Sequence, residues 1–216
     1  MNKHNQWEIV PQPLDSVSSL CFSPFTSMHL AITSWDKTLK LFDITSIISD
    51  NNTLNNQDKV LFSFEHKAPV LDCCFSTEIH LYSGGLDRRV RKFDLFASSV
   101  SILGIHDDAI NSTNMNEPMQ QRESSLKFMT RTVKCTPDGQ GGGDGIVALW
   151  DGVAKKRLRQ YPKYPASISS LAFSNDGKFM AIGTSDDFQD VNQKRTLDNR
   201  VFIREILEGE CRGKVI

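Results

Sequence analysis

The sequence has little that would place the protein in a membrane, in a secretory pathway or on nucleic acid. Its 216 residues contain no apolar run close to the roughly 18 residues that cross a bilayer. Residues 1–6 have no apolar segment like that of a signal peptide, which favours an intracellular protein. The formal net charge of -1 argues against bulk electrostatic binding to nucleic acid or to a membrane surface.

Cysteine is scarce, and the common catalytic motifs are missing. The five cysteines are odd in number and form no C-x-x-C pair, so neither a disulfide framework nor a metal site is expected. Cys21, Cys73 and Cys74 lie in apolar runs, where the expected role is that of a small buried side chain. Neither G-x-S-x-G nor H-E-x-x-H occurs, so the chain offers no hydrolase or zinc-protease signature.

The chain does contain a repeated unit with a fixed internal spacing. An Asp in a turn is followed seven residues later by a second Asp, which comes directly after an aromatic residue. The three copies begin at Asp36, Asp87 and Asp144. Three copies with one spacing indicate a repeat protein.

Short segments of alternating apolar and small polar residues surround these turns and predict a meander of antiparallel strands. Residues 17–22 match residues 70–75 position by position, and His66 precedes His106 by 40 residues. A period of about 40–45 residues with four strands per unit is typical of a WD-repeat β-propeller blade. The predicted fold is therefore all-β, with residues 1–216 as a single WD-repeat propeller domain.

The two ends of the chain are expected to complete one sheet. Residues 201–206 have the pattern of a third strand whose sheet lacks its fourth, and residues 7–10 can supply that strand. Such pairing would remove an exposed sheet edge and close a ring, provided that the ring has enough blades.

Two polar stretches are expected to face solvent. Residues 45–58 are rich in Asn, Ser and Asp and are predicted to form an exposed loop. The basic cluster at residues 88–92 is interpreted as a solvated strand face, with an anion-binding patch as the alternative.

A hydrogen-bonded network is expected inside the units. In such repeats a His before the inner strand, a Ser or Thr in the next strand and the turn Asp can bond in series and end on an aromatic N–H. In the second unit Phe93 stands where that donor is needed and has no N–H, whereas Trp150 supplies one in the third. The residues interpreted as this structural network are His66, Ser83, Asp87, Asp36, Asp144 and Trp150.

Several blocks of the sequence resemble a known family. These blocks are Ser34–Asp36, Val70–Cys73, Ser83–Asp87, Gln121–Phe128 and Tyr164–Ser174. Together they are similar to the Bub-three family, WD-repeat proteins of the mitotic spindle checkpoint. The resemblance implies a seven-bladed propeller without catalysis and without a cofactor. A sister family, the messenger-RNA export WD-repeat protein of the nuclear pore, shares the fold and gives the alternative function.

The resemblance also implies a peptide-binding site. In the family, the top face of the propeller binds a short Glu-containing segment of the checkpoint kinase and its relatives. The exposed Trp of the first Ser-Trp-Asp turn and the Arg after the Ser-Leu-Lys block line that groove, and they correspond to Trp35 and Arg131. Trp offers a large apolar contact, and Arg can bind a Glu carboxylate bidentately. The alternative is that Trp35 packs within its own sheet and Arg131 pairs locally.

Partners and location follow from the same resemblance. The family brings checkpoint kinases to kinetochore scaffolds that carry phosphorylated repeats, which implies the nucleus, the kinetochore in mitosis and also the cytoplasm. Ubiquitin binding is a further property of the family for which the sequence offers no test. No membrane partner and no direct nucleic-acid partner are expected.

The chain is short for seven blades, which at 40 residues each need about 280 residues. Losses are expected near residues 109–119 and 139–143, which leaves material for about four to five blades in an incomplete or strained propeller. The family's basic residues for phosphorylated motifs fall largely in the second gap, so they are not assigned. A truncated product with impaired function therefore stays open, as does an enzyme or small-molecule binder that uses the central channel.

Overall fold

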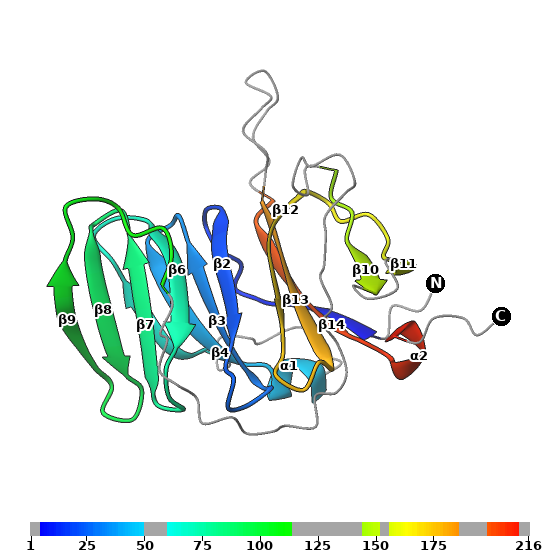
Figure 1. Ribbon diagram of the computed structural model, residues 1–216, viewed down its shortest axis with the longest axis horizontal. Helices are drawn as coiled ribbons and strands as arrows, with labels where there is room; N and C mark the ends of the chain where they lie inside the picture. Colours follow the sequence, from blue (N-terminus) through cyan, green and yellow to red (C-terminus); the bar gives the residue numbers. More distant parts are fainter. Residues whose placement is uncertain (1–4, 50–59, 114–143, 152–155, 186–197, 212–216) are drawn as a thin grey trace, which may run out of the picture.

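The structure, a computed structural model, consists mainly of antiparallel strands. The residues it describes are 5–49, 60–113, 144–151, 156–185 and 198–211. Within them, the strands form three four-stranded sheets and one two-stranded sheet that stand in a row (Figure 1). This arrangement confirms the predicted WD-repeat fold class as an incomplete propeller, with three complete blades and part of a fourth in the described residues.

The sheets are named here by their place in the chain. The first sheet contains β2 (Val17–Phe22), β3 (His29–Ser34), β4 (Thr38–Asp43) and β5 (Val60–Glu65). The second sheet contains β6 (Val70–Phe75), β7 (His80–Gly85), β8 (Arg89–Asp94) and β9 (Ser99–Ile105). The half sheet contains β10 (Ala148–Asp151) and β11 (Lys156–Gln160). The closing sheet contains β12 (Ser167–Phe173), β13 (Phe179–Ser185), β14 (Arg200–Glu205) and β1 (Gln6–Glu8).

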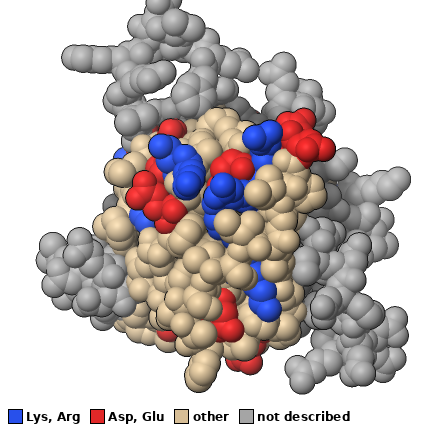
Figure 2. Space-filling model, turned by 90° about the vertical axis from the view of Figure 1, so that its left-hand side faces the viewer, with Lys and Arg blue, Asp and Glu red and all other residues tan. Residues whose placement is uncertain are grey.

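The second sheet stands at one end of the row, with β9 outermost, and the half sheet stands at the other (Figure 1). The side of the molecule at which β9 lies is mostly uncharged, and its Lys, Arg, Asp and Glu side chains gather mainly toward the top of the view (Figure 2). Among the described residues, no further sheet covers the outer side of the second sheet.

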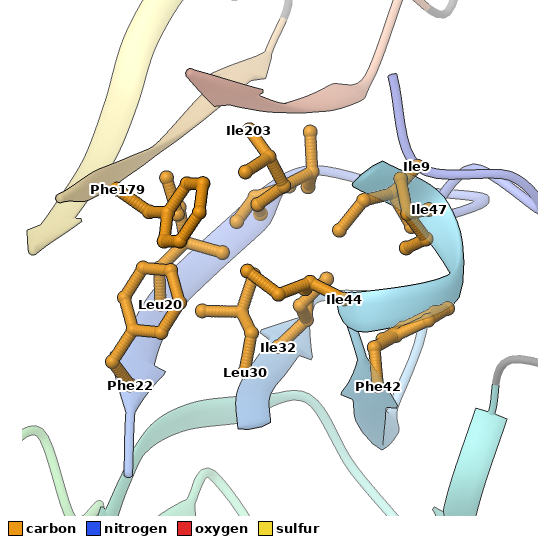
Figure 3. Packing of buried hydrophobic residues seen from close by; sticks show 13 residues of the cluster. Ile9, Leu20, Phe22, Leu30, Ile32, Phe42, Ile44, Ile47, Phe179 and Ile203 are labelled. Carbon is orange, nitrogen blue, oxygen red and sulfur yellow. The ribbon is translucent and has the colours of Figure 1, made fainter. Parts of the chain in front are cut away.

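Three apolar clusters hold neighbouring sheets together. The largest lies between the first and the closing sheets, where Phe22, Leu30, Phe179 and Ile203 point toward one another (Figure 3). A second cluster joins the first and second sheets, and it includes the fully buried ring of Phe93. The third joins the closing sheet to the half sheet. Burial of apolar surface between blades is therefore the main force that keeps the row in order.

The predicted pairing of the two chain ends is confirmed. Strand β1 lies antiparallel to β14, with Gln6 opposite Arg204 and Glu8 opposite Phe202. The next residue, Ile9, is fully buried in the largest cluster, and its N–H donates to the carbonyl of Val201 at 2.8 Å. The N-terminal strand thus supplies the fourth strand of a sheet whose other three come from the end of the chain.

The Asp turns share one backbone geometry. In each, a carboxylate oxygen accepts the N–H of the residue two positions later, at 2.8 Å for Asp36, 3.2 Å for Asp87 and 3.0 Å for Asp144. The residue between them has a left-handed conformation, with φ of 72° at Lys37, 61° at Arg88 and 70° at Gly145. A side-chain-capped turn of this kind is common for Asp. The repeat seen in the sequence is therefore also a repeat in local structure.

Two glycines allow close contact at the end of β7. A Cβ atom at Gly84 would lie 2.3 Å from the side chain of Ile110, and one at Gly85 would lie 2.3 Å from the carbonyl oxygen of Pro69. The segment after the second sheet therefore packs directly on the backbone, and Thr113 donates its N–H to Asp72 at 2.7 Å.

One prediction about the connections was wrong. Residues 45–58 were expected to form an exposed loop, but Thr45–Ser49 form the short helix α1 and Ile47 is buried in the largest cluster. The rest of the predicted loop, residues 50–58, lies outside the described residues. Asp43 accepts the N–H of Thr45 at 2.8 Å, which satisfies a donor at the start of this helix. A second short helix, α2 (Glu208–Cys211), follows the closing sheet. No helix among the described residues is long and apolar enough to cross a membrane.

Candidate functional site

The turn between β3 and β4 presents Trp35 to solvent. Its side chain is 45% exposed, while the backbone around it is fixed by hydrogen bonds. The N–H of Trp35 donates to the carbonyl of Ser16 at 2.9 Å, and Asp36 accepts the N–H of Leu14 at 2.9 Å. Because the backbone of the turn is already fixed, the Trp35 ring can contact a ligand without the entropic cost of ordering its own loop. The alternative, that Trp35 packs within its own sheet, does not fit this exposure.

Further apolar side chains lie on or beside the same kind of turn. Leu86 occupies the position in the second sheet that Trp35 occupies in the first, and it is 40% exposed. Leu14, whose backbone is bonded to the Trp35 turn, is 78% exposed. Sequence reasoning did not select these leucines, although the matching positions of Trp35 and Leu86 in the repeat were visible.

The second residue assigned to the peptide groove, Arg131, lies outside the described residues. The structure therefore describes the surroundings of Trp35 alone, and the pairing of Trp35 with Arg131 stays a prediction.

The network around His66 lies at the interface between the first and second sheets. His66 is 4% exposed, and its Nε2 atom is 3.3 Å from the hydroxyl of Ser83. Its other ring nitrogen, Nδ1, is 2.9 Å from Nη1 of Arg91, and Nη2 of Arg91 is 2.6 Å from the carboxylate of Asp87. His66 and Ser83 are thus in contact as expected, but the order of the contacts differs from the prediction, because Asp87 is connected to His66 through Arg91 and not through Ser83.

Arg91 determines which ring nitrogen of the neutral His66 carries the proton. A guanidinium group only donates hydrogen bonds, so Nδ1 of His66 must accept and Nε2 must carry the proton that points to Ser83. Arg91 itself is 4% exposed, which contradicts the interpretation of residues 88–92 as a wholly solvated face. The signal that would have found it is its place in β8, two residues before the buried Phe93, because alternate residues of a strand share a face.

The remaining network residues have local structural contacts. Asp36 and Asp144 each cap their own turn, as described above. Trp150 is partly buried in β10 and lies opposite Arg157 of β11. His106, which is 40 residues after His66, is exposed.

Burial and charge shift the ionisation of this network. The pKa of His66 is lowered to about 4, chiefly by burial and also by the adjacent charge of Arg91, while the nearby Asp87 raises it by a smaller amount. For Asp87, burial raises the pKa, but the hydrogen bonds from Arg91 and from the N–H of Arg89 outweigh it and leave the pKa below its ordinary value. At neutral pH the site therefore holds a neutral imidazole beside a buried ion pair.

Acidification from pH 6.5 to pH 4 is expected to destabilise the fold through His66. An unfolded His binds its proton near pH 6.5, whereas folded His66 binds it only near pH 4, so the unfolded state takes up the proton first. The contribution of neutral His66 to the free energy of unfolding is therefore fully present well above pH 6.5. It falls by about 3 kcal/mol as the pH approaches 4. Urea unfolding at a series of pH values measures this slope.

Two variants assign the slope to one side chain. His66→Gln has no titrating group and should flatten the slope between pH 6.5 and 4. His106→Gln, at the exposed position 40 residues later, should leave it unchanged. An identical slope in wild type and His66→Gln would contradict the assignment.

The inner strands use their polar side chains to connect the sheets. Ser18 donates to the carbonyl of Val70 at 2.6 Å, and Ser19 donates to Asp72 at 2.8 Å, which joins β2 to β6. On the other side, Ser170 accepts the N–H of Leu20 at 3.1 Å, which joins β12 to β2. These three serines are therefore hydrogen-bonded to groups of the neighbouring sheet. Among the described residues, no group of three or more His, Cys, Asp or Glu could hold a metal ion.

Comparison with known proteins gives a family match in two stretches. The model of the family described as "WD domain, G-beta repeat" matches residues 10–43 and 155–189. The first stretch contains β2, β3 and β4, and the second contains β11, β12 and β13. The matches therefore fall in the first and closing sheets, which pack on each other, and in one strand of the half sheet.

Curated proteins similar to this chain are longer and carry checkpoint names. Mitotic checkpoint protein BUB3.1 of Arabidopsis thaliana is 26% identical over 334 residues, which cover 96% of this chain and 94% of that protein. Mitotic checkpoint protein bub3 of Dictyostelium discoideum is 27% identical over 199 residues, which cover 92% of this chain and 52% of that protein. The alignment with BUB3.1 is longer than the 216 residues of this chain, so that protein has residues without a counterpart here.

A messenger-RNA export protein is also similar, at lower identity. The mRNA export factor GLE2 of Chaetomium thermophilum is 20% identical over 339 residues, which cover 97% of this chain and 93% of that protein. The checkpoint proteins thus resemble this chain more than the export factor does, as the sequence blocks indicated.

Proposed function

We propose that this chain is a non-catalytic scaffold of the spindle checkpoint, because two of its stretches match the WD-repeat model and the mitotic checkpoint Bub3 proteins that it resembles are longer versions of a similar sequence. Its ligand would be a short Glu-containing segment of a checkpoint kinase or a related protein. The observation that carries the proposal is the exposed ring of Trp35 on a turn with a fixed backbone.

The chemistry of the turn suits an extended peptide. Trp35 and Leu86 offer apolar contact from neighbouring sheets, and aromatic side chains of this kind carry much of the binding energy in protein interfaces. Arg131 would add a bidentate bond to the Glu carboxylate of the ligand. Ser18, Ser19 and Ser170 of the inner strands are hydrogen-bonded to groups of neighbouring sheets, which favours a scaffold over a small-molecule binder or an enzyme in the channel.

Location and further partners follow from the checkpoint role. We expect the protein in the nucleus, at kinetochores in mitosis and also in the cytoplasm. Docking to a phosphorylated kinetochore scaffold is the least supported partner, because no basic residues of this chain are assigned to it. Messenger-RNA export is the second candidate function, favoured by the similarity to GLE2.

Trp35→Ala and Arg131→Ala are each expected to weaken peptide binding by about 1–3 kcal/mol, which is roughly 5- to 150-fold in Kd. Fluorescence anisotropy with a labelled Glu-containing peptide from a checkpoint kinase measures the affinity. Leu61→Ala is the matched control, since Leu61 is 52% exposed but lies on the outer strand β5. Unchanged affinity in both site variants would overturn the site, and no binding of the wild-type chain would overturn the function.

A further inference from the structure

Strand β9 is the outer strand of the second sheet, and its surface is unusually apolar. None of its seven residues, Ser99–Ile105, is charged. Four apolar side chains are exposed, and their exposed fractions are 43% for Val100, 50% for Ile102, 56% for Leu103 and 67% for Ile105. Figure 2 shows the side of the molecule at which this strand lies as mostly uncharged.

One edge of β9 has no partner strand in the described part of the chain. The order of the second sheet is β6-β7-β8-β9, and β9 pairs with β8 from Ser99 to Ile105, with one register shift at Leu103. On either side of this shift, alternate residues of β9 direct their N–H and C=O groups away from β8, and such an edge is a template for another strand.

The other outer edges are protected in ways that natural sheets commonly use. Strand β11 carries three exposed cations, Lys156, Arg157 and Arg159. Strand β5 ends in an exposed Glu65, while its Phe residues pack inward against the second sheet. Strand β1 is only three residues long and ends in Glu8. Among these edges β9 alone is long and uncharged.

We propose that β9 pairs antiparallel with β9 of a second copy of this chain. When two identical strands pair, any charged residue lies near a residue of the same charge in the other copy and repels it. Strand β9 has no charged residue, so no such repulsion opposes the pairing. With Ile102 at the centre, Ile102 lies opposite its own copy, Val100 opposite Gly104, and Ser101 opposite Leu103. The pair of Ile102 side chains at the axis is the apolar cross-strand contact of this register, and contacts of that kind stabilise antiparallel pairs.

The pairing is self-limiting. A two-fold axis through the centre of β9 uses the same surface of both copies, which is the usual geometry of a homodimer. Once both β9 edges are paired, neither has a free edge for a third copy. The two second sheets then form one continuous sheet across the dimer, and the Trp35 turns stay outside this interface because they belong to the first sheets.

Sedimentation of the full chain tests the proposal. The wild-type chain should sediment as a dimer at micromolar concentration, and Ile102→Lys should raise the dimer dissociation constant at least tenfold, because two like charges then meet at the axis. Leu61→Lys is the matched control, with a similar exposure of 52% against 50% on another outer strand. A monomeric wild-type chain, or equal dimerisation of both variants, would overturn the proposal.

A crosslink tests the register independently of stability. In Ile102→Cys, a short bis-maleimide should link the two copies, while Leu61→Cys should give no more linked dimer than the wild-type chain with its native cysteines. Circular dichroism of each variant confirms that it is folded. If β9 instead receives a strand from another protein, the purified chain stays monomeric and Ile102→Cys does not crosslink, which also overturns the dimer.

Discussion

A chain that lacks residues 1–10 is expected to lose about 5 kcal/mol of folding free energy. The deletion removes β1 from the closing sheet and takes the fully buried Ile9 out of the largest apolar cluster. Truncation of a buried Ile to Ala alone costs about 2–5 kcal/mol, and each lost backbone hydrogen bond adds about 1 kcal/mol. Because small domains have only about 5–15 kcal/mol in total, the deleted chain should be close to unfolding at 25 °C.

Urea unfolding followed by circular dichroism measures this loss. A synthetic peptide of residues 1–12, added in excess, should restore part of the stability by pairing with the exposed edge of β14. The same peptide with Ile9→Asp should fail, since a carboxylate cannot enter the cluster without a large desolvation cost. An unchanged unfolding midpoint in the deleted chain would contradict the role of β1.

Arg91→Met is expected to destabilise the fold by about 3–5 kcal/mol, since it removes one partner of a buried ion pair. The side chains of Arg91 and Asp87 are 5% and 8% exposed, so the largely buried Asp87 carboxylate would be left without its counter-charge. Nδ1 of His66 would lose its donor in the same step. Thermal and urea unfolding measure the effect.

The control for Arg91→Met is Arg89→Met in the same strand. Arg89 is partly exposed, so its loss should change stability by less than about 0.5 kcal/mol. The pair Asp87→Asn and Arg91→Met should be less destabilising together than the sum of the two single changes, since each removes the same ion pair. Additive effects would show that the two side chains do not act as a unit.

Much of the fold was predictable because strand patterns and turn residues are local. The bounds predicted for β2 and β6 coincide with those observed, and the predicted Asp turns are found between β3 and β4 and between β7 and β8. The pairing of β1 with β14 was predicted from a different argument, the count of strands in the last sheet, and it is present.

Helix α1 was not predicted, because the polar composition of residues 45–58 was given more weight than the helical spacing of their isoleucines. Residues 45–58 are polar overall, but Ile44, Ile47 and Ile48 stand at the spacing of one helix face and pack in or against the largest cluster. A short apolar stripe of this kind becomes decisive only when a core lies beside it, and the sequence alone did not place that core.

The network around His66 shows a similar limit. The sequence pattern identified His66, Ser83 and Asp87 as network residues. The residue that connects His66 to Asp87, however, is Arg91, which was interpreted as solvated because it lies in a basic cluster. Whether an Arg in a strand points to solvent or to the core depends on register, which is set by pairing. For the peptide site, Trp35 is exposed as the resemblance implied, and the role of Arg131 stays a prediction.

The register of β1 on β14 also determines how the molecule responds to mechanical force. Gln6, near the start of the chain, lies opposite Arg204, near its end, so a pull on the two termini loads the same end of this strand pair. The hydrogen bonds of the pair then break one after another, as in a zipper, instead of sharing the load in shear. A tether attached through both ends would open the closing sheet at low force, whereas a tether attached through the outer strand β9 and the N-terminus would load the apolar interfaces between sheets instead.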